Sequence, residues 1–215
     1  MSSVVFVAPF FLDTTLRFVE AVADLAGVRT GLVSQDPAER LPPGLKNKLA
    51  AHFRIADGLD PQQIADAVRG LARQIGPPHR LIGALEQLQV PLGEVRDALG
   101  IEGMGAEVAK NFRDKARMKT VLQRAVVPCA RHQRVTSDAE AWSFVDSAGY
   151  PVVLKPTSGA GAKSTFRVAD AGEMRAALAS VRPSADRQRL SDELVVGHDS
   201  PLDTGRVRGR RARHR

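Results

Sequence analysis

Cysteine is almost absent from this chain, which carries a single thiol, Cys129, among its 215 residues. No disulfide can form within the chain, so a small scaffold held together by disulfides is excluded. Cys129 follows Pro128 and has no recognisable base beside it in the sequence. We therefore do not expect a catalytic nucleophile and interpret Cys129 as a small packed side chain.

Long apolar runs are also missing, since no stretch approaches the roughly 20 apolar residues that a membrane-spanning helix requires. The N-terminal segment Met1–Ala8 has no basic region, and its apolar run is too short for a secretory signal. We expect a cytoplasmic protein without a membrane partner. The five histidines include no pair with metal-ligand spacing, so they predict no metal site.

An excess of positive charge is confined to the end of the chain. Six arginines lie within residues 205–215, and removing them from the 31 basic residues leaves 25 against 24 acidic ones. We interpret residues 205–215 as a basic, disordered tail and do not expect a nucleic-acid partner, because no aromatic stacking residues lie there. The alternative is a non-catalytic interaction module, whose tail contacts a polyanion and whose N-terminal unit forms a homodimer or holds a ligand.

Residues 1–105 alternate between strand and helix patterns, and a hydrophobic fraction of 43% is sufficient for a packed core. The predicted strands are Ser3–Ala8, Val28–Ser34 and Arg80–Leu85, and the predicted helices are Asp13–Ala26, Asp60–Ile75 and Val90–Leu99. This alternation predicts an α/β unit with a Rossmann-like parallel sheet. No Gly-x-Gly-x-x-Gly follows the first strand, which argues against a dinucleotide site. Asp13, Thr14 and Thr15 are interpreted as helix-capping residues, with a ligand contact as the alternative.

A further helical pattern opens at Asn111, and Asp114 lies early in it, where a carboxylate favours a helix N-terminus. Lys115 follows directly. The apolar stripe predicted for this helix consists of Phe112, Ala116, Met118, Val121 and Leu122. The segment Thr136–Glu140 predicts the start of another helix, and Gly149 its end.

The next segment predicts two strands joined by a loop of small residues. The apolar run Val152–Leu154 is typical of a buried strand, and it ends in Lys155. Thr157–Ser164 contains two glycines, and Thr165–Val168 can return as the second strand. Backbone N–H groups in such a loop can approach phosphate oxygens while a lysine supplies the counter-charge. An ordinary turn is the alternative.

In this order, the Asp-Lys pair, the Val-Pro pair, a helix, the strand ending in Lys-Pro and the small-residue loop resemble the nucleotide-binding half of the ATP-grasp superfamily. Its members are ligases that join a carboxylate to an amine or thiol through an acyl phosphate. The resemblance implies that ATP is bound, with Lys115 and Lys155 at its phosphates. It also implies a loop that closes over the phosphates, formed by Ser158, Gly159, Ala160, Gly161, Ala162 and Ser164.

The resemblance divides the chain into a pre-ATP-grasp domain at 1–105, a partial ATP-grasp region of α+β type at 106–204 and the tail at 205–215. Residues 190–204 resemble the family strand written E-E-F-V-x-G-x-E. The adenine-facing positions would be Asp192, Glu193, Leu194 and Val195, and Asp199 would replace the ribose-binding glutamate. Asp192 and Asp199 are shorter than the usual glutamates, and Pro201 interrupts the following strand. Solvent-exposed carboxylates at a strand end are the alternative.

The intact family also uses magnesium, a small carboxylate substrate and an arginine that steadies the acyl phosphate. The sequence contains no counterpart of the magnesium ligands or of that arginine, so no catalytic residue is assigned. We therefore expect a chain truncated before the metal-binding subdomain, which binds ATP but lacks full turnover. Chemistry of the biotin-dependent carboxylase type is disfavoured, because the loop has fewer glycines than in that subgroup.

Overall fold

The computed structural model describes residues 1–158, 164–184 and 189–193, with the backbone alone in the last range. The chain divides into two compact units. The first comprises Met1–Pro128 together with Thr157 and Ser158, and the second comprises Cys129–Pro156 and the described residues from Ser164 onward. The domain boundaries at 105/106 and 204/205 stay predictions.

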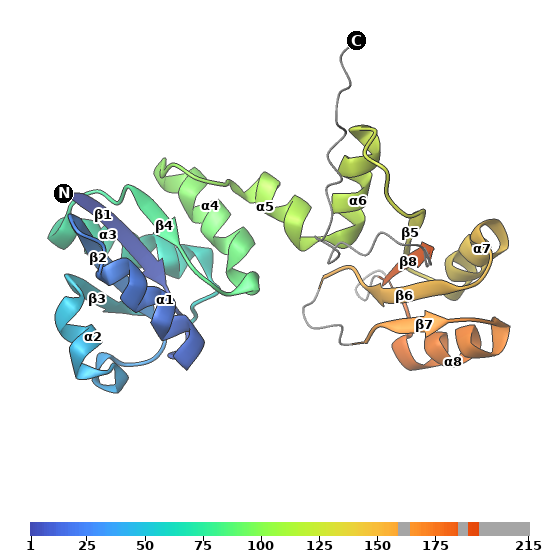
Figure 1. Cartoon of the computed structure of the whole chain (residues 1–215), viewed down its shortest axis with the longest axis horizontal. Helices are drawn as coiled ribbons and strands as arrows, with labels where there is room; N and C mark the ends of the chain where they lie inside the picture. The colour runs from blue at the N-terminus through green and yellow to red at the C-terminus, as the bar shows by residue number, and fades with distance from the viewer. Residues whose placement is uncertain (159–163, 185–188, 194–215) are drawn as a thin grey trace, which may run out of the picture. The chain divides into compact units, whose positions relative to one another are not determined.

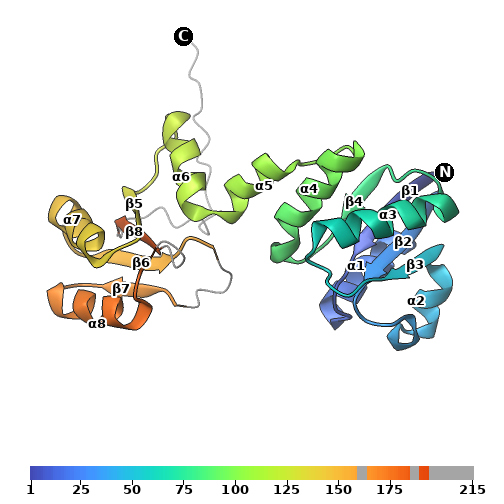
Figure 2. The same cartoon turned by 180° about the vertical axis from the view of Figure 1, so that it is seen from behind.

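The described part of the first unit contains a parallel sheet with strand order β3-β2-β1-β4 (Figures 1 and 2). Its strands are β1 Ser2–Val7, β2 Val28–Ser34, β3 Ala51–Arg54 and β4 Arg80–Ile82. The central strand β1 pairs on both edges, where Val5 is in register with Gly31 of β2 and Leu81 of β4. A strand that is paired on both edges and covered on both faces favours a continuous apolar run, which β1 supplies.

Helices cover both faces of this sheet (Figures 1 and 2). They are α1 Asp13–Ala23, α2 Pro43–Lys48, α3 Pro61–Ile75 and α4 Gln89–Leu99, with short 3₁₀ turns at Ala38–Arg40 (η1) and Glu86–Leu88 (η2). Buried residues of α3 and α4 pack with Val5 and Val7, whereas residues of α1 and α2 pack with Phe6 and Leu32. The predicted α/β class with a parallel sheet is confirmed.

Helix α3 has the best-marked local sequence signals in the first unit. Its apolar residues Ile64, Val68, Leu71 and Ile75 are all buried, as their spacing predicts. Asp60 is the N-cap, and its carboxylate accepts hydrogen bonds from the backbone N–H of Gln62 at 2.8 Å and of Gln63 at 3.4 Å. The side-chain amide of Gln63, followed by these N–H groups, holds the pKa of Asp60 below its usual value.

Replacing Asp60 with alanine will lower the melting temperature, because two N–H groups of α3 lose their partner. The native pKa of Asp60 is lowered, so the ionised carboxylate stabilises the fold above pH ~4, and this contribution is lost as pH falls through the native pKa. Thermal unfolding from pH 7 to pH 3 should show the difference from wild type narrowing with acid. Asp66→Ala, on the same helix, is the matched control, and a difference that does not change with pH would contradict the assignment.

Two further helices follow α4 in the first unit, namely α5 Ala106–Arg113 and α6 Lys115–Arg124. The prediction of one helical pattern from Asn111 is wrong, because Asp114 has extended backbone (φ −99°, ψ 110°) and separates the two helices. Figure 1 shows the chain turning sharply at this junction. The predicted apolar stripe is also wrong as a buried face, since Ala116 is buried but Phe112 is 63% exposed and Val121 40% exposed.

The second unit contains an antiparallel sheet with strand order β5-β8-β6-β7 in its described part. The strands are β5 His132–Val135, β6 Val152–Pro156, β7 Phe166–Val168 and β8 Arg189–Glu193, and the helices are α7 Asp138–Ala148 and α8 Ala171–Val181. Val152 and Leu154 of β6 form one core cluster with residues of both helices, so α7 and α8 cover the same face. This architecture confirms the predicted α+β unit.

The sequence also predicted how α7 begins and ends. Ser137 is its N-cap and accepts a hydrogen bond from the backbone N–H of Glu140 at 3.3 Å, while the Glu140 carboxylate accepts from the backbone N–H of Thr136 at 2.6 Å. Gly149 ends the helix with a φ of +78°, which favours glycine. The signals at Thr136–Glu140 and at Gly149 are confirmed.

Several predicted boundaries in the first unit are wrong. Helix α1 ends at Ala23, three residues earlier than predicted, and strand β4 ends at Ile82. Leu12 occupies the N-cap position of α1, so the interpretation of Asp13 as a cap is wrong, because this residue is the first of the helix. Strand β3, Ala51–Arg54, was not predicted, because its sequence Ala-His-Phe-Arg lacks the apolar alternation of a half-buried strand.

Within the described residues, none of the helices combines the length and the apolar character needed to cross a membrane.

Candidate functional site

Lys155 is positioned by the central strand of the second unit. Strand β6 is flanked by β7 and β8, and its side chains alternate, so Val152 and Leu154 are buried in the core. Lys155 therefore projects from the opposite face, together with Val153, and its side chain is half-buried. The strand end thus presents an ammonium group without burying it in the apolar core, which would be costly.

Lys115 is the first residue of α6, and the sequence fixes this position through Asp114. The Asp114 carboxylate accepts hydrogen bonds from the backbone N–H of Ala116 at 2.9 Å and of Arg117 at 3.0 Å. Its carbonyl accepts from the N–H of Met118 at 2.8 Å. Asp114 therefore caps α6, so the helix begins at the next residue, Lys115.

The remaining leading N–H of α6 ties this helix to the small-residue loop. The backbone N–H of Lys115 donates to the carbonyl of Thr157 at 2.9 Å, a contact within the first unit. All four leading N–H groups of α6 are thus engaged by protein acceptors. The backbone donors of α6 that often bind anions at a helix start are therefore occupied, and the Lys115 ammonium is a side-chain group that a phosphate could meet there.

The structure brings Lys115 beside the start of the predicted closing loop. Thr157 lies two residues after Lys155 and one before Ser158, which is exposed. At the other end of the loop, Ser164 is exposed and has a φ of +57°, an uncommon value for a residue other than glycine that marks a tight turn. The loop positions Gly159, Ala160, Gly161 and Ala162 lie outside the described residues.

The predicted adenine-facing residues lie only partly in the described chain. Asp192 and Glu193 are in β8, where Asp192 is in register with Val153 of β6 and His132 of β5. Glu193 is in register with Val152. Leu194, Val195 and Asp199 lie outside the described residues, so their roles stay predictions.

The contacts that hold α5 and α6 in place were not predicted from the sequence. At the end of α5, the Arg113 guanidinium pairs with Glu86 of η2 at 2.7 Å. In the first turn of α5, Glu107 pairs with Lys110 at 2.7 Å and with Arg117 at 2.8 Å. These two cations, Lys110 more strongly, lower the pKa of Glu107 to about 2. The pairs join residues of opposite charge, but only the fold shows which partners meet.

A magnesium site is not built by the described residues. Among residues 1–158, 164–184 and 189–193, no three His, Cys, Asp or Glu side chains come close enough together to hold a metal ion. Magnesium prefers several oxygen ligands. The described residues therefore do not fit the ion that the resemblance implies.

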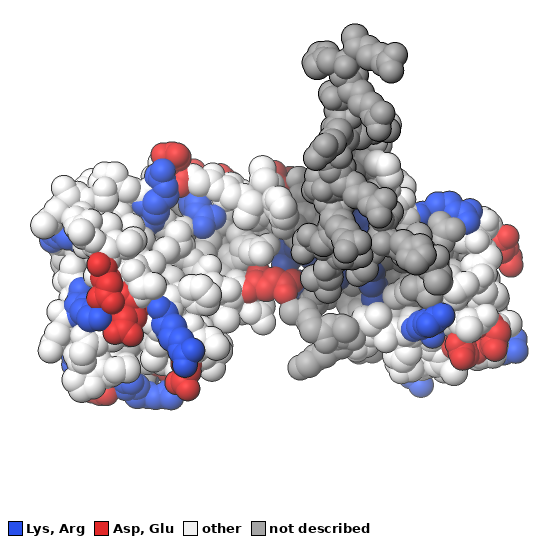
Figure 3. All heavy atoms as spheres, viewed as in Figure 1, with Lys and Arg blue, Asp and Glu red and all other residues white. Residues whose placement is uncertain are grey.

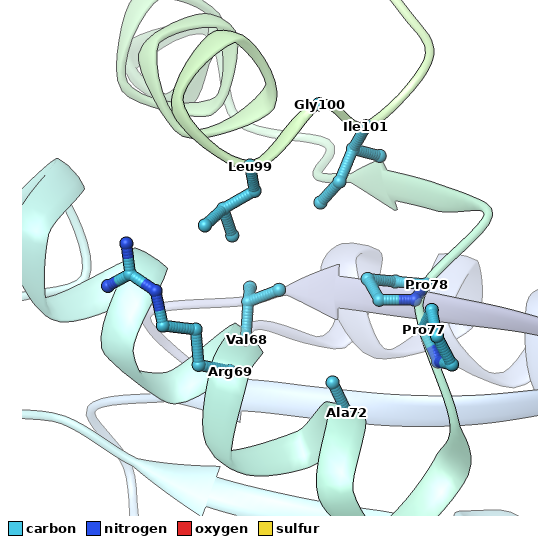
Figure 4. A pocket seen from close by; sticks show the side chains of 8 residues that line it. All are labelled: Val68, Arg69, Ala72, Pro77, Pro78, Leu99, Gly100 and Ile101. Carbon is cyan, nitrogen blue, oxygen red and sulfur yellow. The ribbon is translucent and has the colours of Figure 1, made fainter.

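A separate cavity of about 270 Å³ lies in the first unit between α3, the end of α4 and the segment before β4 (Figure 4). It is lined by Val68, Arg69, Ala72, Pro77, Pro78, Leu99, Gly100 and Ile101. Ligands of α/β sheets usually bind at the carboxyl ends of the strands, whereas this cavity lies where β4 begins. Its walls are mostly apolar, and the Arg69 guanidinium already pairs with Asp66 at 2.7 Å. Phosphate-binding groups do not converge there.

Charges of both signs are interspersed on the first unit. In the view of Figure 3, Lys and Arg side chains lie beside Asp and Glu side chains on this unit. One example is Lys48, whose ammonium lies 2.9 Å from Glu20 and 2.8 Å from Asp24. The alternative of a polyanion-binding module therefore depends on residues 205–215, which lie outside the described residues.

Comparison with protein families gives a match over residues 114–196 to the carbamoyl-phosphate synthase L chain, ATP binding domain. The match begins at Asp114, the N-cap of α6, and includes Lys115 and Lys155. The chain is 27% identical over 117 residues to an L-arginine-specific L-amino acid ligase of Bacillus subtilis, covering 54% of this chain and 28% of the relative. It is 26% identical over 188 residues to a D-alanine–D-alanine ligase of an Azoarcus species, covering 87% of this chain and 54% of the relative.

Among solved structures, an L-amino acid ligase from Bacillus licheniformis superposes with a TM-score of 0.69 at 17% identity. The match covers 92% of this chain and 45% of that chain. At this identity the likeness shows the fold. The chain thus spans between about a quarter and about half the length of these relatives.

Proposed function

Because this chain belongs to the ATP-grasp superfamily, we propose that it binds ATP through its phosphates. The Lys115 and Lys155 ammonium groups contact the phosphate oxygens, and the segment from Ser158 to Ser164 closes over them. The observation that carries the proposal is the hydrogen bond from the Lys115 N–H to the Thr157 carbonyl. This bond supports the proposal, because it joins the first residue of α6 to Thr157, which follows Lys155 by two residues in the sequence.

The physical basis is charge complementarity. A triphosphate needs cationic donors, and lysine provides a compact ammonium on a flexible stem that can follow the phosphate oxygens. The Asp114 carboxylate and the Asp114 and Thr157 carbonyls accept from the leading N–H groups of α6. The Lys115 side chain is therefore the group of this helix start that we assign to the phosphates. In the same proposal, the strand at Asp192–Val195 faces the adenine and Asp199 the ribose.

In the longer ligases that this chain resembles in part, we propose that the bound ATP activates a small carboxylate. A carboxylate oxygen attacks the γ-phosphorus, the bond from that phosphorus to the β,γ-bridging oxygen breaks, and ADP leaves. An amine then attacks the resulting acyl phosphate, releasing phosphate and forming an amide. The residues of this chain contribute by holding and orienting the phosphates, which is the main protein contribution to phosphoryl transfer.

We also propose that the carboxylate substrate of the longer ligases is a small molecule and that this chain is located in the cytoplasm. The names of the relatives, amino acid ligases and a D-alanine–D-alanine ligase, favour an amino acid as the carboxylate and carbon–nitrogen bond formation. The described residues provide no set of ligands for magnesium, so none of them is assigned to the ion.

Isothermal titration of the purified chain with ATP in the presence of magnesium tests the proposal. We expect saturable binding with a stoichiometry near one, competed by ADP because the adenine, the ribose and two phosphates are shared. Inorganic triphosphate serves as the control for non-specific attraction to the basic tail. No saturation at millimolar ATP would overturn the proposal, and binding of triphosphate as tight as that of ATP would remove the adenine- and ribose-facing roles from Asp192–Val195 and Asp199.

A further inference from the structure

Arg117 connects the two helices on either side of the break at Asp114. Its Nε donates to the Asn111 side-chain oxygen at 2.6 Å, and its Nη2 donates to the Glu107 carboxylate at 2.8 Å. Nη2 also lies 3.4 Å from the Glu107 carbonyl oxygen. Glu107 and Asn111 are one turn apart on α5, so a single guanidinium from the first turn of α6 holds two successive turns of α5.

This contact lies where the backbone changes direction between two helices. Asp114 alone separates α5 from α6: its N–H donates to the Lys110 carbonyl of α5 at 2.9 Å, its carbonyl accepts from Met118 of α6 at 2.8 Å, and its own backbone is extended. The orientation of α6 relative to α5 therefore depends on side-chain contacts across the junction. Arg117 supplies such contacts with a planar group that forms several hydrogen bonds in a fixed geometry.

The other end of this assembly is held on the body of the first unit. Arg113, the last residue of α5, pairs with Glu86 of η2 at 2.7 Å. The Asp97 carboxylate of α4 accepts from the backbone N–H of Ala106, the first residue of α5, at 2.9 Å. Helix α5 is thus held at both ends. The hydrogen bonds of Arg117 then attach the first turn of α6, which begins with Lys115, to α5.

We infer that Arg117 is a positioning residue for the Lys115 ammonium. The inference rests on the proposed nucleotide site and deepens it. Arg117 orients the first turn of α6, so both the Lys115 side chain and the N–H that holds Thr157 lie in their binding positions before the nucleotide arrives. Such preorganisation lowers the cost of binding, because the ligand does not have to order the helix itself.

Lys110 provides a matched control within the same cluster. Lys110 and Arg117 both pair with Glu107 and both lower its pKa, but Lys110 lies on α5 and does not cross the junction. Arg117→Gln and Lys110→Gln remove the same formal charge from the same carboxylate. Any difference between them in nucleotide affinity therefore reports on the bridge between α5 and α6, and not on the net charge.

The test is isothermal titration with ATP and magnesium on wild type, Arg117→Gln, Lys110→Gln and Lys115→Ala. We expect Arg117→Gln to weaken binding roughly fivefold, a modest coupling energy, and Lys110→Gln to leave the affinity within about twofold of wild type. Arg117→Lys should also weaken binding, because the ammonium keeps the charge but loses the planar geometry. Melting temperatures should change little, since surface ion pairs contribute little to stability.

The double variant Lys115→Ala/Arg117→Gln separates positioning from direct contact. If Arg117 acts through Lys115, adding Arg117→Gln to Lys115→Ala should cause little further loss of affinity. A full additional loss would show that Arg117 contacts the phosphates itself and would overturn the inference. Equal affinities for Arg117→Gln and Lys110→Gln would overturn it as well, and would leave the proposed function standing. Absence of binding by the wild type would overturn both.

Discussion

Replacing Lys115 or Lys155 with alanine will weaken the binding of ATP with magnesium roughly 10- to 100-fold, as expected for the loss of a charge-assisted hydrogen bond. Lys115 begins α6, and the backbone donors of that helix end are already engaged by Asp114 and Thr157. The leading backbone N–H groups of α6, all of which are described, are therefore not vacant to compensate for the missing ammonium. Isothermal titration of both variants measures the loss.

The matched control for these variants is Lys46→Ala. Lys46 is an exposed lysine in the short helix α2, so its replacement changes the net charge equally without touching α6 or β6. We expect its affinity to stay within about twofold of wild type, the small effect of one exposed charge. Equal affinities for all three variants and wild type would remove Lys115 and Lys155 from the site.

Replacing Gly93 with alanine should destabilise the first unit, although alanine is normally the better helix former. A Cβ atom at Gly93 would lie 2.7 Å from the Cα of Ala106 and 2.8 Å from the carbonyl carbon of Gly105, and both are backbone atoms that cannot rotate away. Overpacking of this kind costs about 1–3 kcal/mol, which outweighs a gain in helix propensity of about 1 kcal/mol or less. Urea unfolding measures the change in the free energy of unfolding.

Gly44→Ala is the matched control for Gly93→Ala and should have the opposite sign. Gly44 also lies in a helix, α2, but apart from its chain neighbours and the backbone of its own helix no described atom lies within 4 Å of a Cβ built there. We expect a gain of up to about 1 kcal/mol, because alanine restricts the unfolded chain without meeting an obstacle. If Gly93→Ala were as stable as Gly44→Ala, α5 would not be packed against α4 as closely as the structure shows.

Much of the fold could be predicted because local signals agree with the tertiary structure. Asp60 and the apolar spacing from Ile64 to Ile75 determine α3, and the capping residues from Thr136 to Glu140 determine the start of α7. The run before Lys155 has the apolar character of a strand that is paired on both edges. In each case residues close in sequence carry the information.

The prediction failed where distant contacts decide the structure. The break at Asp114 could not be separated from a continuous helix, because an aspartate near a helix start has the same local pattern whether it caps the helix or lies in its first turn. Strand β3 is held by its pairing with β2 and has weak propensity of its own. The bridge from Arg117 to Glu107 spans ten residues and two helices, so no periodicity indicates it.

The complete engagement of the leading N–H groups of α6 has a consequence for covalent regulation. Acetylation of a lysine removes its charge and leaves the backbone unchanged. At a helix end with vacant amides, such a modification would leave part of the anion attraction in place. Here the amides already donate to Asp114 and Thr157, so acetylation of Lys115 would remove its charge without leaving vacant amides of α6 to replace it.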